Sequence, residues 1–409
     1  MAIELKSGND KISFALPSHT DILTTRDPEY TINRDDFGQL VKDQLKKING
    51  ENFERTVIVI SDKTRLCGYD NYLPWLTDIL EKEGCTRENI TFIIAYGTHP
   101  RQTDEESLAS YGPIYNQYRF VHHDCDDEAM LATIGTTKRG THIRIRKEIM
   151  EATLLITFGA ISHHYFAGYG GGRKLIFPGL GARASIYQNH SLFLDMEHHH
   201  LEQHCQPGNL EGNPLSDDLK EVDDMLPEKI SIHGILNGKG KVCQLMAGIT
   251  YDDFLSACRK HDSYFRSENK NVYDLVVASA GGYPKDINFI QSHKSVHNAS
   301  AFVKDNGTLI LLAECRDGLG NKAFPELFRA GGWDAIFDKM EKHYEGNGGT
   351  ALAMLAKSRR INIKLVTSLS EDTCHMMGAE KINAEKAFDL IAHFSGSVAA
   401  IPNASMLVK

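Results

Sequence analysis

Short apolar runs alternate along the chain with stretches in which apolar residues recur at helical spacing. The runs are mostly continuous, which predicts buried strands over residues 56–61, 90–96, 153–158, 274–280, 308–313, 361–366 and 397–401. Between them we expect helices over 73–82, 182–194 and 287–303, and Thr103–Glu106 has the capping-box pattern of a further helix start. This alternation predicts an α/β fold in which the sheets are mainly parallel.

The polar stretch 259–271 lacks a clear apolar period, and we interpret it as a linker. A chain of 409 residues is long enough for two domains of ordinary size. The linker then separates an α/β domain at 1–268 from a second at 269–399, with residues 400–409 as a candidate for return to the first. We expect an active-site cleft between the two domains.

Composition narrows the classes of function. No apolar run reaches the roughly 18 residues of a membrane span, and the N-terminal residues lack the pattern of a secretion signal. The net charge is −9 and no basic stretch is dense, which argues against binding to nucleic acid. The eight cysteines form no C-x-x-C pair, so we expect reduced thiols in a cytoplasmic protein. The 19 histidines point to metal binding or proton transfer.

Polar clusters follow four of the predicted strands at the point where each strand ends. In open α/β sheets, ligands bind at the carboxyl ends of the strands, so these clusters are candidates for a common site. The clusters are Ser61–Arg65, Gly97–His99, His163–Lys174 and Gly281–Asp286, the last leading into a helix that carries Gln291 and Lys294.

The third cluster contains a glycine-dense turn that ends in Arg173 and Lys174. Glycines let the backbone approach a ligand closely and direct N–H groups toward it, which suits a phosphate. The turn has neither the Walker pattern nor the G-x-G-x-x-G spacing of dinucleotide-binding proteins. A plain flexible turn is the alternative. The glycines concerned are Gly168, Gly170, Gly171 and Gly172.

Three side chains suit an anionic substrate. Arg65 offers a guanidinium fork for a carboxylate, Lys294 a point charge and Gln291 an amide donor. Because Gln291 and Lys294 are three residues apart on a predicted helix, they are expected to share a face.

The histidines divide into two groups. His99 and His164 are candidate acid/base residues, and His190, late in its helix, is a candidate metal ligand. The conspicuous run from His198 to Cys205 is interpreted as a solvated helix end. Its alternative is a metal site in which His200 and His204 share a helix face.

These clusters, in their order and spacing, resemble the nickel-pincer lactate racemase family over most of the chain. The segment around Lys174 is the most specific part of the resemblance. The motifs are Asp62-Lys-Thr-Arg65, Gly97-Thr-His99, Asp124–Met130 with Gly135–Gly140, His164–Lys174, His190, Gly212-Asn-Pro214, and Gly281–Asp286 with Gln291 and Lys294.

The resemblance implies a racemase or epimerase of a 2-hydroxy acid. Its cofactor is a nickel-pincer nucleotide, pyridinium-3,5-bisthiocarboxylic acid mononucleotide nickel. It further implies that the first domain binds this cofactor, that the second contributes to substrate binding, and that maturation proteins insert sulfur and nickel. The roles implied are covalent attachment at Lys174, nickel ligation by His190, acid/base catalysis by His99 and His164, carboxylate binding by Arg65, Gln291 and Lys294, support by Asp62, and nucleotide binding by Gly168, Gly170–Gly172 and Arg173.

Hydride transfer explains why such a site needs two histidines. Hydride removal avoids a carbanion at the weakly acidic Cα, and each histidine serves the hydroxyl of one enantiomer. The chain departs from the family pattern at His163, where proline is common, and at Gly170, where serine is usual. An additional histidine at 293 suggests a larger or more polar substrate than lactate, and the alternative is a solvated helix residue.

Two other functions stay open from the residues alone. One is an oxidoreductase of a hydroxy or keto acid with a dissociable nicotinamide cofactor, which the missing dinucleotide motif disfavours. The other is a non-enzymatic metal-binding protein that uses His200 and His204.

Overall fold

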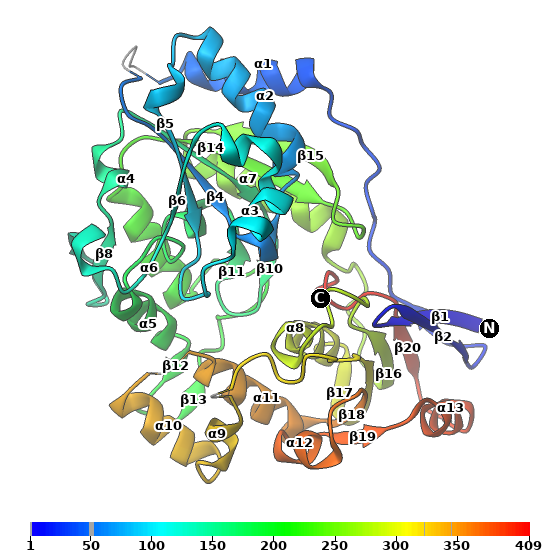
Figure 1. Ribbon diagram of the computed structural model, residues 1–409. Helices are drawn as coiled ribbons and strands as arrows, with labels where there is room; N and C mark the ends of the chain where they lie inside the picture. The colour runs from blue at the N-terminus through cyan, green and yellow to red at the C-terminus, as the bar shows by residue number, and fades with distance from the viewer. Residues whose placement is uncertain (1, 49–52, 323, 345) are drawn as a thin grey trace. The chain divides into compact units, whose positions relative to one another are not determined.

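The computed structural model describes residues 2–48, 53–322, 324–344 and 346–409 (Figure 1). The chain divides into two compact units, each built on one large sheet. We call residues 27–192 with 204–262 the first unit, and residues 1–26, 193–203 and 263–409 the second unit.

The first unit has a six-stranded sheet in the order β15-β14-β9-β4-β5-β6. All neighbouring pairs are parallel except β14 with β15, which are antiparallel. The strands are β4 (Thr56–Ser61), β5 (Ile90–Ala95), β6 (Arg119–His122), β9 (Leu154–Ala160), β14 (Ile230–Leu236) and β15 (Val242–Gly248).

The helices of the first unit cover this sheet, and two short hairpins extend from it. The helices are α1 (Arg34–Leu45), α2 (Tyr69–Lys82), α3 (Asp104–Tyr111), α4 (Glu148–Glu151), α5 (Arg183–Ser191), α6 (Pro214–Asp224) and α7 (Tyr251–Phe265). The hairpins are β7 (Leu131–Thr136) with β8 (His142–Arg146), and β10 (Ser162–His164) with β11 (Gly168–Gly170). Short 3-10 helices include η1 (Lys63–Arg65) and η5 (Gly172–Leu175).

The second unit has a six-stranded, fully parallel sheet in the order β19-β18-β17-β16-β20-β3. Its strands are β3 (Asp21–Ile22), β16 (Tyr273–Ser279), β17 (Val303–Leu312), β18 (Asn362–Val366), β19 (Glu380–Ile382) and β20 (Val398–Ile401). Its helices are α8 (Phe289–Ser300), α9 (Phe324–Arg329), α10 (Trp333–Lys342), α11 (Gly348–Arg360), α12 (Glu371–Met376) and α13 (Ala384–Ala392). Two antiparallel hairpins complete it, β1 (Ala2–Ser7) with β2 (Asp10–Ala15), and β12 (Leu194–Asp195) with β13 (His200–Leu201).

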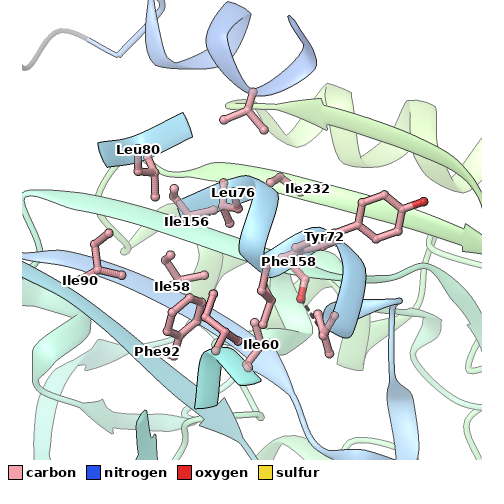
Figure 2. Close-up of a cluster of buried hydrophobic side chains, with 14 of the residues drawn as sticks. Ile58, Ile60, Tyr72, Leu76, Leu80, Ile90, Phe92, Ile156, Phe158 and Ile232 are labelled. Carbon is pink, nitrogen blue, oxygen red and sulfur yellow. Dashed lines mark hydrogen bonds between the residues drawn. The ribbon is translucent and has the colours of Figure 1, made fainter. Parts of the chain in front are cut away.

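The core of the first unit lies between its sheet and the helices α1 and α2. Every residue of β4 is buried, as expected for a parallel strand covered on both faces. Tyr69, Tyr72, Leu73, Leu76 and Leu80 recur at helical spacing along α2 and belong to the buried cluster that includes the sheet residues. Figure 2 shows Tyr72, Leu76 and Leu80 against the sheet. This apolar stripe begins one turn before the predicted start at residue 73, which is why α2 begins at Tyr69.

Phe158 occupies the middle of this core, and its removal tests the packing. Its ring is fully buried and lies 5.5 Å from the ring of Tyr69 and 6.2 Å from that of Phe37. We expect Phe158→Ala to lower the free energy of unfolding by about 3–5 kcal/mol, measured by urea denaturation. Phe158→Leu, which fills more of the space, is the control and should cost less. Equal stability of the alanine variant and the parent chain would contradict this assignment of the core.

The predicted fold class is confirmed, because both sheets are mainly parallel and alternate with helices. The capping box at Thr103 is also confirmed: its hydroxyl accepts the N–H of Glu106, whose carboxylate accepts the N–H of Thr103. The predicted linker at 259–271 is wrong in its first half, since α7 continues through Phe265. Buried residues such as Phe254 and Cys258 give α7 an apolar face that the charged residues around it conceal in the sequence.

The structure also differs from the predicted domain division at 268/269. Residues 1–26 and 193–203 lie in the second unit, as do residues 400–409. Leu5 and Phe14 of the N-terminal hairpin are buried in the same apolar cluster as Leu275, and β20 pairs in parallel with β16. Pairing and burial between segments distant in sequence therefore assign both ends of the chain to the second unit.

None of the helices among the described residues combines the length and apolar character needed to cross a bilayer. The eight cysteines all lie in described segments, where each is buried and none forms a disulfide.

Candidate active site

Three neighbouring strands bring the predicted residues of the first unit together. β9, β4 and β5 are adjacent and parallel, so their carboxyl ends meet at one edge of the sheet. Asp62 and Arg65 follow β4, His99 follows β5, and the β10–β11 hairpin follows β9. The sequence prediction that strand-end clusters share a location is confirmed for these three clusters.

Asp62 and His99 form a buried carboxylate–imidazole pair. Asp62 is 2% exposed, and its Oδ2 lies 2.7 Å from Nδ1 of His99. Its Oδ1 accepts the backbone N–H of Thr64 at 2.8 Å, and the guanidinium of Arg65 lies 3.8 Å from Oδ2. Burial alone would raise the pKa of Asp62, but the hydrogen bond from His99 and the charge of Arg65 lower that pKa to about 2. Asp62 is therefore ionised, and it places the proton of His99 on Nδ1 and the lone pair on Nε2.

His164 and Lys174 face each other across the glycine-rich hairpin. Nε2 of His164 lies 3.4 Å from Nζ of Lys174, and Nδ1 of His164 accepts the backbone N–H of Ala167 at 3.3 Å. Loss of solvent contact, followed by the charges of Arg173 and Arg65, lowers the pKa of Lys174 well below its usual range. The amine is thus favoured in its neutral, nucleophilic form.

His190 lies near Lys174, on the last turn of α5. Its Nδ1 is 2.8 Å from the backbone carbonyl of Ile186, one helical turn earlier, and a carbonyl can only accept. The proton is therefore on Nδ1 and the lone pair on Nε2. Burial is the main cause that lowers the pKa of His190 to about 3, so the ring is neutral at pH 7. A neutral imidazole whose second nitrogen donates to a carbonyl has the form of a metal ligand.

Phe166 joins these side chains and was not among the predicted site residues. Its ring centroid lies 4.5 Å from that of His164 and 5.1 Å from that of His190, and Nζ of Lys174 lies 5.5 Å from it. An aromatic wall of this kind excludes water from the three polar groups. Phe166 lies between His164 and Gly168, inside the most specific motif, and this position could have identified it from the sequence.

The glycines of the hairpin are explained by packing within the chain. Gly168, Gly171 and Gly172 have positive φ values of 75°, 76° and 52°. A Cβ atom at Gly168 would lie 2.3 Å from the carbonyl oxygen of Asn209, and one at Gly171 would lie 2.2 Å from that of Ala160. At these positions glycine is therefore needed by the backbone itself. The plain-turn alternative is wrong, because β10 and β11 form a regular antiparallel hairpin.

Arg173 is a buried cation with unused hydrogen-bonding capacity. It is 4% exposed, its Nη2 donates to Oγ of Ser216 at 2.9 Å, and its guanidinium lies 4.7 Å from the ring centroid of Phe254. Its Nε and Nη1 have no hydrogen-bond partner among the described residues. Buried N–H groups without partners are costly, so this guanidinium is suited to an anion.

In the second unit, α8 carries Gln291 and Lys294 on one face as predicted. Nζ of Lys294 donates to Oε1 of Gln291 at 2.9 Å, and Lys294 is exposed. His293, between them, is 1% exposed, and burial with the charge of Lys357 lowers its pKa well below the usual range. It is neither solvated nor cationic, so it supplies no argument for a larger substrate. The reason is that Phe289, His293 and Val296 form the buried stripe of α8.

The alternative metal site at His200 and His204 is wrong in its geometry. His200 lies in β13 of the second unit, and its Nε2 is 3.1 Å from Oδ2 of Asp195. His204 belongs to the first unit and lies outside any helix. The two residues therefore do not share a helix face.

Buried neutral histidines predict an acid-sensitive fold. His233 is 1% exposed, and burial lowers its pKa to about 4. Below pH 6.5 this histidine takes up a proton in the unfolded chain but not in the folded chain. Its contribution to the free energy of unfolding is therefore full above pH 6.5 and is lost as the pH falls toward 4. Between pH 6.5 and 5 the loss is about 2 kcal/mol.

Denaturation at several pH values tests this expectation. His233→Leu should flatten the dependence of unfolding free energy on pH in that window, whereas the exposed His393→Gln should leave it unchanged. A His233→Leu profile parallel to that of the parent chain would contradict the expectation.

Comparisons with known proteins identify the family of the chain. The family model of the lactate racemase N-terminal domain matches residues 8–202, and that of the C-terminal domain matches residues 268–348. The lactate racemase of Thermoanaerobacterium thermosaccharolyticum is 31% identical over 339 residues, which are 80% of this chain and 78% of that protein. The chain belongs to the lactate racemase family.

Further relatives extend this result. The lactate racemase of Lactiplantibacillus plantarum is 31% identical over 274 residues, 66% of this chain and 62% of that protein. The structure of the lactate racemase apoprotein from T. thermosaccharolyticum has a TM-score of 0.86 at 26% identity, covering 100% of this chain and 99% of that one. A protein from Thermotoga maritima shares the fold, with a TM-score of 0.68 at 15% identity over 93% and 99% of the two chains.

Membership of the lactate racemase family confirms the predicted resemblance. It also confirms the prediction that the chain is an isomerase, because the curated relatives are named as racemases.

Proposed function

We propose that this chain racemises or epimerises a 2-hydroxy acid by hydride transfer with a lysine-tethered nickel-pincer nucleotide. The observation that carries the proposal is the grouping of a neutral lysine, a ligand-type histidine and two acid/base histidines at one sheet edge. The lysine is Lys174, the ligand-type histidine is His190, and the acid/base histidines are His99 and His164, all in the first unit. When bound, the pincer group supplies a hydride acceptor.

The residues around Lys174 fit the proposed cofactor. The lowered pKa of Lys174 favours the nucleophilic amine that covalent attachment requires. Nε2 of His190 offers a lone pair for nickel, because its Nδ1 donates to Ile186. The unpartnered Nε and Nη1 of Arg173 suit the nucleotide phosphate better than the glycines do, since packing already accounts for Gly168 and Gly171.

Each of the two acid/base histidines is placed to exchange a proton with the substrate. His99 donates from Nδ1 to Asp62, so its Nε2 is ready to accept the proton of a substrate hydroxyl. His164, beside Lys174, can exchange a proton with the substrate oxygen in the same way, as the imidazole when it accepts and as the imidazolium when it donates. This pairing supports a reaction in which one imidazole removes a hydroxyl proton and the other returns one.

We propose that Arg65 binds the substrate carboxylate in the first unit, and that Gln291 and Lys294 are anion-binding groups of the second unit. Arg65 has a side chain that is 53% exposed and lies beside the Asp62–His99 pair, so its guanidinium is accessible. Gln291 and Lys294 offer an amide and an ammonium group from one face of α8. Lactate is the simplest substrate that meets these requirements.

Isotope labelling tests the proposed reaction. Protein produced together with its cofactor-maturation proteins is incubated in D2O with each enantiomer of lactate, and with larger 2-hydroxy acids. Hydride transfer predicts racemisation in which the Cα hydrogen is retained from the substrate. Incorporation of solvent deuterium at Cα would instead indicate deprotonation and would overturn the mechanism. A 3-hydroxy acid is the control substrate and should remain unchanged.

A further inference from the structure

A second group of possible metal ligands lies in the first unit and has no part in the proposed reaction. It consists of His163 on β10 and His261 and Asp262 on α7. Nε2 of His163 lies 2.7 Å from Oδ1 of Asp262, and the rings of His163 and His261 meet edge to face with centroids 4.5 Å apart. One ligand atom from each residue lies within 4.8 Å of the others.

We propose that His163, His261 and Asp262 bind a zinc ion. Two imidazoles and one carboxylate are the donor set of three-ligand zinc sites, which leave a fourth position for water. Ligand atoms at about 2.0–2.2 Å from a tetrahedral ion lie roughly 3.4 Å apart, so small side-chain rotations suffice from the present separation.

The burial of the cluster suits an ion that the three side chains coordinate directly. The side chain of His163 is 6% exposed and His261 is 5% exposed, whereas the side chain of Asp262 is 23% exposed. The imidazoles are therefore shielded from water, and the carboxylate lies at the edge where an ion can enter. An ion on Nε2 of His163 takes the place of the proton that this nitrogen shares with Asp262.

The site has a structural consequence for the neighbouring histidine. Successive residues of a strand point to opposite faces, so His163 faces α7 while His164 faces Lys174. An ion bound by His163 and α7 fixes the hairpin that carries His164.

Zinc titration of the full-length protein, after removal of metal by a chelator, tests the site. We expect the parent chain to hold one zinc equivalent here and His261→Ala to weaken the affinity at least about tenfold, since even residues outside the ligand shell contribute that much. Asp262→Asn is a second, nearly isosteric variant, and circular dichroism checks that both variants fold. With Co2+ in place of zinc, the visible absorption bands should be lost in both variants.

Two control variants separate this site from other histidines. His190→Ala removes the proposed nickel ligand, and His198→Ala disrupts the exposed cluster of Asp195, His198 and His200. Both should leave this zinc affinity unchanged. Unchanged affinity in His261→Ala and Asp262→Asn, loss of binding only in His198→Ala, or no zinc retained by the parent chain would each overturn the proposal. The readout does not depend on racemase activity, so it stands apart from the proposed function.

Discussion

Lys174→Ala is expected to abolish both the covalent cofactor and racemisation. In intact-mass analysis of protein matured with its cofactor, the parent chain should be heavier than its sequence mass, whereas the variant should have the sequence mass. The physical reason is that attachment needs the neutral amine of Lys174, which is held beside His164 and Phe166. Chiral chromatography should find no conversion above that of a sample without protein.

Two variants control for charge and for the number of lysines. Lys174→Arg keeps a long basic side chain but cannot form the same covalent bond, and it should also lack the added mass. The exposed Lys138→Ala should keep both the mass and the activity. An added mass that persists in Lys174→Ala would show that attachment occurs elsewhere.

His99→Gln is expected to slow racemisation by about 10²–10⁴-fold, the usual contribution of a general acid or base. The loss in kcat/KM must be equal in both directions, because two enantiomers have equal free energies and their equilibrium constant is 1. Asymmetry is therefore sought in a single turnover. In a single turnover, His99→Gln should still oxidise to the 2-keto acid the enantiomer whose hydroxyl His164 serves. His164→Gln should oxidise the other enantiomer.

This design separates the two histidines from each other and from a loss of folding. The exposed His142→Gln is the control and should racemise at the parent rate. Asp62→Asn removes the carboxylate that accepts the Nδ1 proton of His99. This variant should therefore oxidise the same enantiomer as His99→Gln does. If both histidine variants lost both half-reactions equally, the assignment of one histidine to each enantiomer would be wrong.

The elements around the site could be predicted because the information for them is local. The strand 56–61 matches β4 residue for residue, and the helix predicted at 182–194 appears as α5 at Arg183–Ser191. The position of polar residues directly after β4, β5 and β9 then follows from the parallel order of those strands. The partner of His190 is also local, since Ile186 is one helical turn away.

The features that escaped prediction depend on contacts between distant segments. His163 and Asp262 are 99 residues apart in sequence, and no local pattern joins them. The assignment of the N-terminal hairpin to the second unit rests on burial of Leu5 and Phe14 in a common cluster with Leu275. The burial of His293 was readable in principle, because Phe289 and Val296 lie at helical spacing from it and mark an apolar stripe.

The placement of β20 determines when the second unit can form during protein synthesis. β20 lies between β16 and β3 in the sheet, so β3 has no neighbouring strand until residues 398–401 have left the ribosome. The first unit lies within residues 27–262 and has all its strands much earlier. We therefore expect nascent chains to acquire a protease-resistant first unit while β3 still lacks its partner strand β20.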